Sequence, residues 1–119
     1  MEMILLPHDH GGTLHLEHMP HAEDFSTVAE LFKLLGDSSR VRLFWILCHC
    51  EECVINLSAM MGMSSPAVSH HLKLLRAYGL IGSRREGKEV YYKAADTALV
   101  GQLHEMMEQM LEITCDSGL

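Results

Sequence analysis

The sequence predicts a mainly α fold with one β-hairpin, in the order ααααββα, over residues 23–119. Three observations support this: apolar residues recur at helical spacing in several segments, cap-forming residues stand at the segment ends, and a β-rich stretch surrounds a Glu-Gly turn. A chain of 119 residues is the size of one domain. Residues 1–22 show no persistent period, so we expect a flexible, His-rich N-terminal arm before that domain.

The first helix is predicted at about residues 26–35, and Gly36 suits its C-terminal cap. Its apolar stripe consists of Val28, Leu31, Phe32 and Leu35. The second helix covers "RVRLFWILCH", residues 40–49, with Ser38 or Ser39 as the expected N-cap.

A short third helix fits "NLSAMM" and ends at Gly62. Ser64 can cap a longer fourth helix, "SPAVSHHLKLLRAY", with Pro66 tolerated in its first turn. A short helix, the tight turn "GMSS" and a longer helix together predict a helix-turn-helix.

The stretch "LIGSRREGKEVYYKA" predicts a β-hairpin that turns at Glu86 and Gly87. A last helix follows over about residues 96–114, with a wide face of Leu, Met and Ile side chains. That face is too apolar for the surface of one small domain, so it predicts contact with a second subunit.

The charges and the fourth helix indicate DNA binding. The net charge is −7, yet residues 33–93 hold all nine Lys and Arg against five acids. A basic middle region can present a positive face to phosphate. Small polar groups early in a recognition helix suit base edges in the major groove, here Ser64, Ser65, Ser69, His70 and His71. Lys73 on that helix, and Arg84, Arg85 and Lys88 in the hairpin, suit the phosphate backbone or the minor groove.

Several classes of protein are disfavoured by what the sequence lacks. It has no apolar run of membrane-spanning length and no signal-peptide pattern, so we expect a cytoplasmic protein without membrane contact. It has no nucleophile elbow and no phosphate loop. Cys50 and Cys53 have Cys-x-x-Cys spacing, but they do not open a helix after a strand as a thioredoxin-like site would require. We therefore expect no enzyme activity and no organic substrate.

Three of the four cysteines, Cys48, Cys50 and Cys53, lie within "LCHCEECVINL". Clustered cysteines in a reducing compartment more often indicate metal or redox chemistry than disulfides. Three thiolates suit arsenic(III) or antimony(III), and a fourth ligand would suit zinc or cadmium. The candidates for that ligand are Cys115, expected just past the last helix, His49, and arm histidines such as His8 and His10. Cys48 is equally well explained as a core residue.

His104 and Glu108 share a helix face at i, i+4 and could form a metal site of their own. Such pairs are common on solvated helices, so a polar surface is the favoured interpretation.

The segments "LFKLLGDSSRVRLFWIL" and "SSPAVSHHLKLLRAYGLIGSRREGKEVYY" resemble the ArsR/SmtB family of winged helix-turn-helix repressors, and the likeness extends over residues 25–113. The resemblance implies a homodimer joined by the first and last helices, whose paired recognition helices read a palindromic operator. It implies repression of nearby genes, relieved by an inducer that is most often a metal or metalloid ion. The positions that match base-facing residues of the family are Ser65, Pro66, Ser69 and His70, and those that match its wing are Arg84, Arg85 and Lys88.

The same resemblance concerns two metal sites. Many members take ligands from a Cys-Val-Cys pair at the third helix, often with one from the arm; Cys53 matches the first cysteine, but Ile55 replaces the second. A second family site on the last helix matches Asp96, Ala98, Gln109 and Glu112, of which only two can bind metal.

The leading hypothesis is thus a repressor that releases DNA on binding a thiophilic ion. One alternative is a redox-responsive repressor in which Cys50 or Cys53 pairs with Cys115 on oxidation or persulfidation. Another is a metal buffer or carrier, which the His-rich arm favours but which leaves the basic hairpin unexplained.

Overall fold

The structure is a computed structural model, and it describes residues 2–4, 7–8, 14–16 and 19–116. The chain divides into two compact units, Met1–Phe32 and Lys33–Leu119. This division falls ten residues beyond the expected end of the arm at residue 22, because the first helix belongs largely to the N-terminal unit.

The N-terminal unit contains two short strands that the sequence did not reveal. Strands β1 (Glu2–Ile4) and β2 (Leu14–Leu16) pair antiparallel, with Met3 opposite His15. Three residues are too few to show a strand period, which is why this segment read as irregular. The flexibility of the arm remains a prediction.

Helix α1 (Ala22–Leu34) begins four residues before the expected start at Ser26. Its first turn is stabilised by Asp24, whose carboxylate accepts a hydrogen bond of 2.9 Å from the backbone N–H of His21. This is the backward half of a capping box, and it satisfies a donor that the helix itself leaves unpaired. The helix therefore starts before its apolar stripe, which is why the stripe alone placed the start too late.

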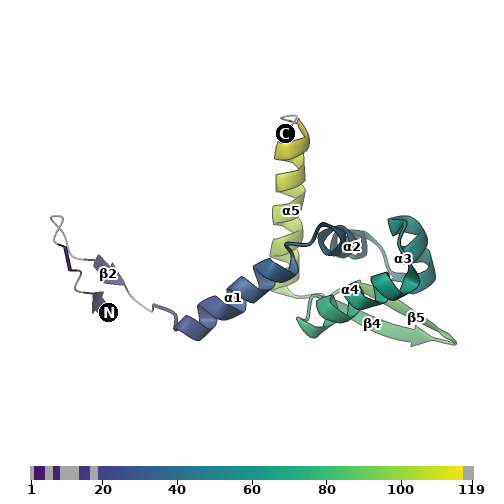
Figure 1. The fold of residues 1–119 in the computed structure, drawn as a ribbon, viewed down its shortest axis with the longest axis horizontal. Helices are drawn as coiled ribbons and strands as arrows, with labels where there is room; N and C mark the ends of the chain where they lie inside the picture. The colour runs from purple at the N-terminus through teal and green to yellow at the C-terminus, as the bar shows by residue number, and fades with distance from the viewer. Residues whose placement is uncertain (1, 5–6, 9–13, 17–18, 117–119) are drawn as a thin grey trace. The chain divides into compact units, whose positions relative to one another are not determined.

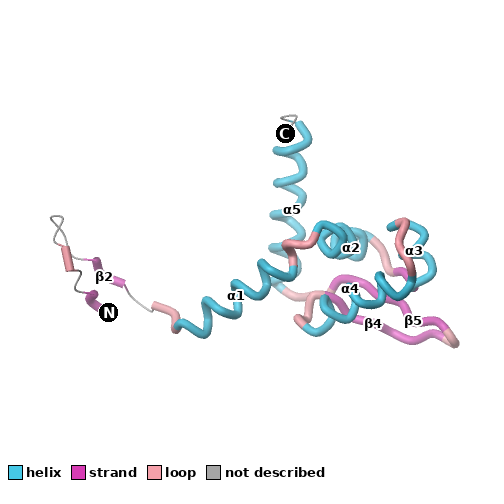
Figure 2. The backbone as a smooth tube through the Cα atoms, in the orientation of Figure 1, coloured by secondary structure: helices cyan, strands magenta, loops and turns pink. Residues whose placement is uncertain are grey.

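After α1, the second unit contains the remaining elements in the predicted order and one additional short strand (Figures 1 and 2). The elements are α2 (Ser38–His49), β3 (Glu52–Cys53), α3 (Val54–Met61), α4 (Ser65–Ala77), β4 (Ile81–Glu86), β5 (Glu89–Ala94) and α5 (Ala98–Asp116). The predicted mainly α fold with a β-hairpin wing is confirmed.

Helix α2 starts with Asp37 as its N-cap, not with the predicted Ser38 or Ser39. The Asp37 carboxylate accepts a hydrogen bond of 3.0 Å from the backbone N–H of Arg40. That bond is the main cause that holds the pKa of Asp37 below its usual value, so the cap is ionised at neutral pH.

The predicted helix-turn-helix is formed by α3 and α4. Gly62 closes α3 at a φ of 65°, a left-handed conformation that favours glycine. Ser64 caps α4 as predicted, and its hydroxyl accepts a hydrogen bond from the backbone N–H of Ala67 at 3.3 Å. One face of α4 is anchored in the core through Val68, Leu72 and Leu75.

The three-stranded sheet has the order β3-β5-β4 and is antiparallel throughout. The hairpin turns at Gly87–Lys88, between the paired residues Glu86 and Glu89. Strand β3 joins the far side of β5, with Cys53 opposite Tyr91. The segment that carries the cysteines is therefore hydrogen-bonded to the wing. The core beneath is apolar, and its most enclosed side chains are Leu43, Phe44, Leu57, Val68, Leu72, Leu75 and Leu80.

Helix α5 buries Val100, Leu103 and Met107 and packs against α2. Much of its remaining apolar surface is exposed: Leu99, Met106, Met110, Leu111 and Ile113. It extends to Asp116, so Cys115 belongs to its last turn rather than lying past the helix as expected. Within the described residues, no helix has the length and hydropathy that crossing a bilayer requires.

Candidate nucleic-acid interface and metal ligands

The N-terminal half of α4 presents polar side chains to solvent. Ser65, Pro66, Ser69 and His70 are all exposed, whereas Val68 and Leu72 of the same helix are buried. Ser65 also contacts α3, since its hydroxyl lies 3.1 Å from that of Ser58. The predicted base-reading residues thus form one accessible surface on a helix whose other face is fixed in the core, the arrangement that a recognition helix requires.

His71 differs from the other predicted DNA-binding residues of α4. It is half-buried, and its Nδ1 lies 3.4 Å from a guanidinium nitrogen of Arg40, whose Nε donates to the carbonyl of Leu34. Burial lowers the pKa of His71, so the ring is held neutral and can accept from Arg40. His71 therefore helps to fasten α4 to the start of α2, whereas Lys73 lies exposed further along α4.

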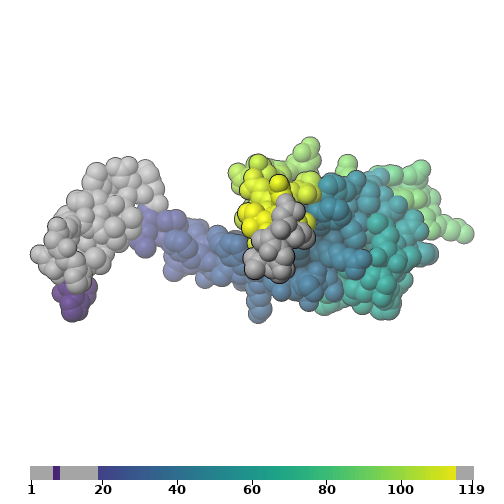
Figure 3. Space-filling view, turned by 90° about the horizontal axis from the view of Figure 1, so that it is seen from above, coloured from purple at the N-terminus to yellow at the C-terminus, as the bar shows by residue number. Residues whose placement is uncertain are grey.

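The hairpin tip protrudes beyond α3 and α4, as Figures 1 and 3 show. Arg85 and Lys88 are exposed there. Arg84 is engaged in ion pairs, 2.8 Å to Glu51 and 2.6 Å to Glu86, and its guanidinium lies 4.9 Å from the ring centre of Tyr91. Two carboxylates already balance the Arg84 charge, so Arg85 and Lys88 are the better placed for phosphate.

The cysteine segment (residues 48–53) does not form an assembled thiol site. Cys48 lies in the last turn of α2, Cys50 follows as its C-cap, and Cys53 is a buried N-cap of α3. The Cys50 thiol donates to the carbonyl of Ile46 at 3.4 Å. Burial raises the pKa of Cys50, and burial together with Glu108 raises that of Cys48 to about 11. Cys48 and Cys50 are therefore thiols at neutral pH.

The described residues do bring one group of three potential ligands together, and it contains no cysteine. The group is His49, His104 and Glu108, whose ligand atoms all lie within 4.8 Å of one another. The pairing of His104 with Glu108 is visible in the sequence at i, i+4, whereas the participation of His49 depends on how α2 packs against α5. Of the remaining candidates, His8 is exposed, and His10 and the Cys115 side chain lie outside the described part of the chain.

Comparisons with known proteins agree with this architecture. Residues 37–83 match the family described as bacterial regulatory protein, arsR family. The chain is 41% identical over 85 residues to a "Transcriptional repressor SmtB homolog" of Synechocystis sp., a match covering 71% of this chain and 64% of that protein. It is 34% identical over 87 residues to "Arsenic resistance transcriptional regulator ArsR2" of Pseudomonas putida, a match covering 72% of this chain and 75% of that protein.

A solved structure shows the same fold. The homodimeric winged helix-turn-helix DNA-binding domain Mb0332 from Mycobacterium bovis, described as a possible ArsR-family transcriptional regulator, superimposes with a TM-score of 0.69. Its identity is 25%, and the match covers 83% of this chain and 91% of that one. From the matched helix-turn-helix, the wing and these relatives, we conclude that the chain belongs to the arsR family of DNA-binding transcriptional regulators.

Proposed function

We propose that this protein is a homodimeric repressor that binds operator DNA through α4 and the β4–β5 hairpin and releases it on binding a thiophilic metal or metalloid ion. The observation that carries the proposal is the exposed polar surface of α4, held on a buried apolar face and flanked by a protruding basic tip. The names of the relatives, a repressor and an arsenic resistance regulator, favour the same function.

The dimer is supported by the apolar surface of α5. Met110 and Ile113 are 55% and 64% exposed, an unusual position for side chains of this kind in a protein that acts alone. The homodimeric relative of the same fold is consistent with a second subunit covering this surface.

The inducer is proposed to act at the cysteine segment, because its ligands are soft and its backbone is joined to both DNA-binding elements. Cys53 pairs with Tyr91 of the wing and also caps α3 of the helix-turn-helix. The thiols fit arsenic(III), antimony(III) or cadmium in donor type. Since they are not assembled in the described structure, binding requires the segment to rearrange, and a rearrangement there would disturb β3 and the wing.

The energy required is small. An ion that binds the DNA-free state about tenfold more tightly than the DNA-bound state shifts the equilibrium by about 1.4 kcal/mol.

The DNA-binding half of the proposal is tested with two matched variants, on a specific site selected from a random DNA pool. His70→Ala should weaken binding to the specific site much more than binding to random DNA, because a base contact carries sequence information. Arg85→Ala should weaken binding to both DNAs, because a phosphate contact carries no sequence information. It should also reduce the salt dependence of binding by about one counterion. Equal loss on both DNAs for His70→Ala would remove it from base readout.

The inducer half is tested by adding arsenite or cadmium to the protein–DNA complex. Wild type should release DNA, and the Cys50→Ser, Cys53→Ser double variant should bind DNA normally but retain it. Normal release by that variant would contradict the proposed site. Release that requires an oxidant, ignores every ion and is lost in Cys115→Ser would support the redox alternative instead.

A further inference from the structure

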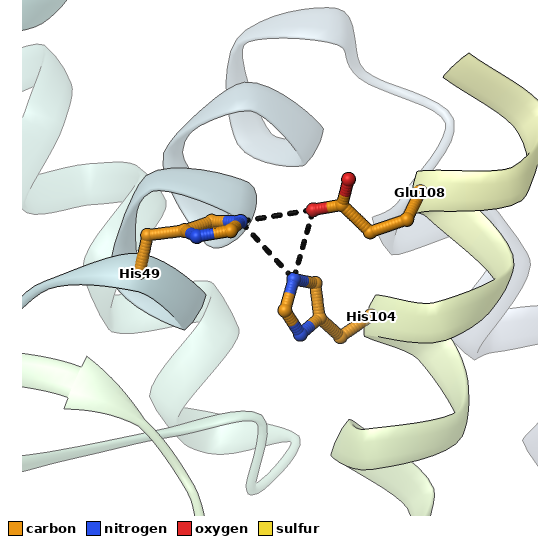
Figure 4. Close-up of side chains that lie close together, drawn as sticks. All are labelled: His49, His104 and Glu108. Atoms are coloured by element: carbon orange, nitrogen blue, oxygen red, sulfur yellow. Dashed lines mark hydrogen bonds and ion pairs between the residues drawn. The ribbon is translucent and has the colours of Figure 1, made fainter. Parts of the chain in front are cut away.

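The cluster of His49, His104 and Glu108 joins two helices and is separate from the DNA-binding surface, although His49 lies in the cysteine segment between Cys48 and Cys50. His49 is the last residue of α2, whereas His104 and Glu108 lie one turn apart on α5. Figure 4 shows the two imidazoles and the carboxylate pointing at one another. The separations are 2.9 Å from His49 Nε2 to Glu108 Oε1, 3.0 Å from His104 Nε2 to the same oxygen, and 3.1 Å between the two nitrogens.

Hydrogen bonds alone cannot satisfy all three of these contacts. If both Nε2 atoms carry protons, both donate to Glu108, but the two N–H groups then face each other at 3.1 Å. If either Nε2 is deprotonated, its lone pair faces the carboxylate oxygen at about the same distance. With Glu108 ionised, one edge of the triangle is therefore repulsive in every imidazole tautomer. A cation bound by all three atoms removes the conflict, because each atom then directs a lone pair at it.

We propose that His49, His104 and Glu108 form a binding site for a borderline divalent metal ion such as zinc. Two imidazoles and one carboxylate are a ligand set that zinc uses in proteins. Tetrahedral zinc with bonds of about 2.0–2.1 Å separates its ligand atoms by roughly 3.3 Å, so these three need to move apart by only a few tenths of an ångström. The site is thus nearly in the geometry of its bound form.

Trp45 orients the carboxylate from outside the triangle. Its indole N–H donates to Glu108 Oε1 at 2.9 Å, and its ring lies 4.2 Å from that of His49. Partners of this kind fix the orientation of metal ligands and strengthen binding. An oxygen with two lone pairs can accept from Trp45 and still bind one ion.

The three side chains are accessible from solvent, with exposed fractions of 44% for His49, 31% for His104 and 45% for Glu108. An ion can therefore enter without unfolding, and water can complete its coordination. Nitrogen and oxygen donors discriminate against arsenic(III), which thiolates suit. This site is consequently distinct in chemistry from the proposed inducer site, and it would join α2 to α5 rather than act on the wing.

The test is a zinc titration of full-length, reduced, metal-free protein in competition with a chromogenic chelator. It involves no DNA, so its failure would leave the proposed repressor function untouched. His104→Asn and Glu108→Gln should each lose one zinc equivalent, with affinity falling by more than about a hundredfold, beyond the loss typical of an outer partner. Trp45→Phe should weaken binding by about tenfold. The matched controls His70→Asn and Glu105→Gln, exposed on α4 and α5, should bind as wild type does.

Cobalt(II) separates this site from the cysteines, since only thiolate ligands give intense sulfur-to-metal charge-transfer absorption. A variant with all four cysteines changed to Ser should keep the zinc equivalent that His104→Asn removes, and its cobalt complex should lack that absorption. Unchanged stoichiometry and affinity in both His104→Asn and Glu108→Gln would overturn the proposal. Loss of that equivalent in the variant without cysteines would overturn it as well.

Discussion

The cysteine segment and the His49–His104–Glu108 cluster differ in how the spacing of their ligands along the chain relates to the distances between those ligands in the fold. The cysteines are neighbours in the chain, yet their thiols do not form a site, because Cys48 lies in a helix, Cys50 ends it and Cys53 is drawn into the core. Residues two apart on a helix do not face each other. In the other set, His49 is more than fifty residues from His104 and Glu108, which lie one turn apart on α5, and the three meet through the packing of α2 on α5. Close spacing is thus a guide to ligand geometry only when the backbone conformation is known: a separation of four residues on a helix brings His104 to Glu108, whereas the spacing of the cysteines does not assemble them.

The difference also distinguishes two uses of a ligand set. An assembled, solvent-accessible cluster binds an ion with little rearrangement, which suits a clamp between helices. A dispersed set must reorganise to bind, which suits a switch, because the reorganisation itself can be transmitted.

The largest expected effect is that variants of the two regions each lose the binding of a different ion. The Cys50→Ser, Cys53→Ser variant should lose arsenite affinity by at least about a hundredfold and keep the zinc equivalent, whereas His104→Asn should do the reverse, because the two donor sets prefer different ions. Isothermal titration of both proteins with both ions measures this. A variant that loses both ions equally would show that the two regions form one site.

Thiol reactivity in the metal-free protein should differ strongly from that of a free cysteine. Burial raises the pKa of Cys48 to about 11. At pH 7.5 its thiolate fraction, and hence its alkylation rate, should be on the order of a hundredfold below that of N-acetylcysteine, and should rise with pH. Glu108→Gln removes the lesser cause of the shift, so it should accelerate Cys48 by less than tenfold. Peptide-resolved mass spectrometry after iodoacetamide treatment measures both rates, and a fast Cys48 would contradict the burial.

A smaller effect is expected in the free energy of unfolding, to which the two regions should contribute differently. Cys53 is a buried N-cap that makes no capping hydrogen bond, so Cys53→Ala should cost about 1–2 kcal/mol, whereas Cys53→Ser should recover about 1 kcal/mol by capping α3. His104→Ala, at a partly exposed site that contributes nothing to the apolar core, should stay within about 0.5 kcal/mol of wild type. Urea denaturation measures all three. Equal stability of the Ser and Ala variants would argue against the cap.

The smallest effect concerns the ion pair between the cysteine segment and the wing. Arg84→Ala should leave DNA affinity within about threefold, because Glu51 and Glu86 already occupy its guanidinium. It should reduce the response to arsenite by less than about fivefold, since exposed ion pairs contribute little. Anisotropy titrations with and without arsenite measure this, with Arg85→Ala as the comparison. A larger DNA defect for Arg84→Ala than for Arg85→Ala would place Arg84 at the phosphate.

Local signals were enough to predict the helix-turn-helix, the wing and the long last helix. Gly62 and Ser64 carry their own conformational preferences, so the turn and the α4 cap were confirmed at the expected residues. Strand β3 could not be predicted because two residues have no period and its pairing with Tyr91 is a tertiary contact. The proximity of His49 to His104 could not be predicted for the same reason, because it is a tertiary contact that depends on the packing of α2 against α5.

The contacts of Trp45 also make it an optical reporter. It is the only tryptophan in the chain; its ring contacts that of His49 in a tilted arrangement, and its indole N–H donates to Glu108. When it is excited at wavelengths that tyrosine does not absorb, its fluorescence therefore reports on the edge of the His49–His104–Glu108 cluster and not on the wing, whose aromatic residues are tyrosines. Emission from the unlabelled protein should follow occupancy of this cluster by an ion, while DNA binding is followed independently through a dye on the DNA.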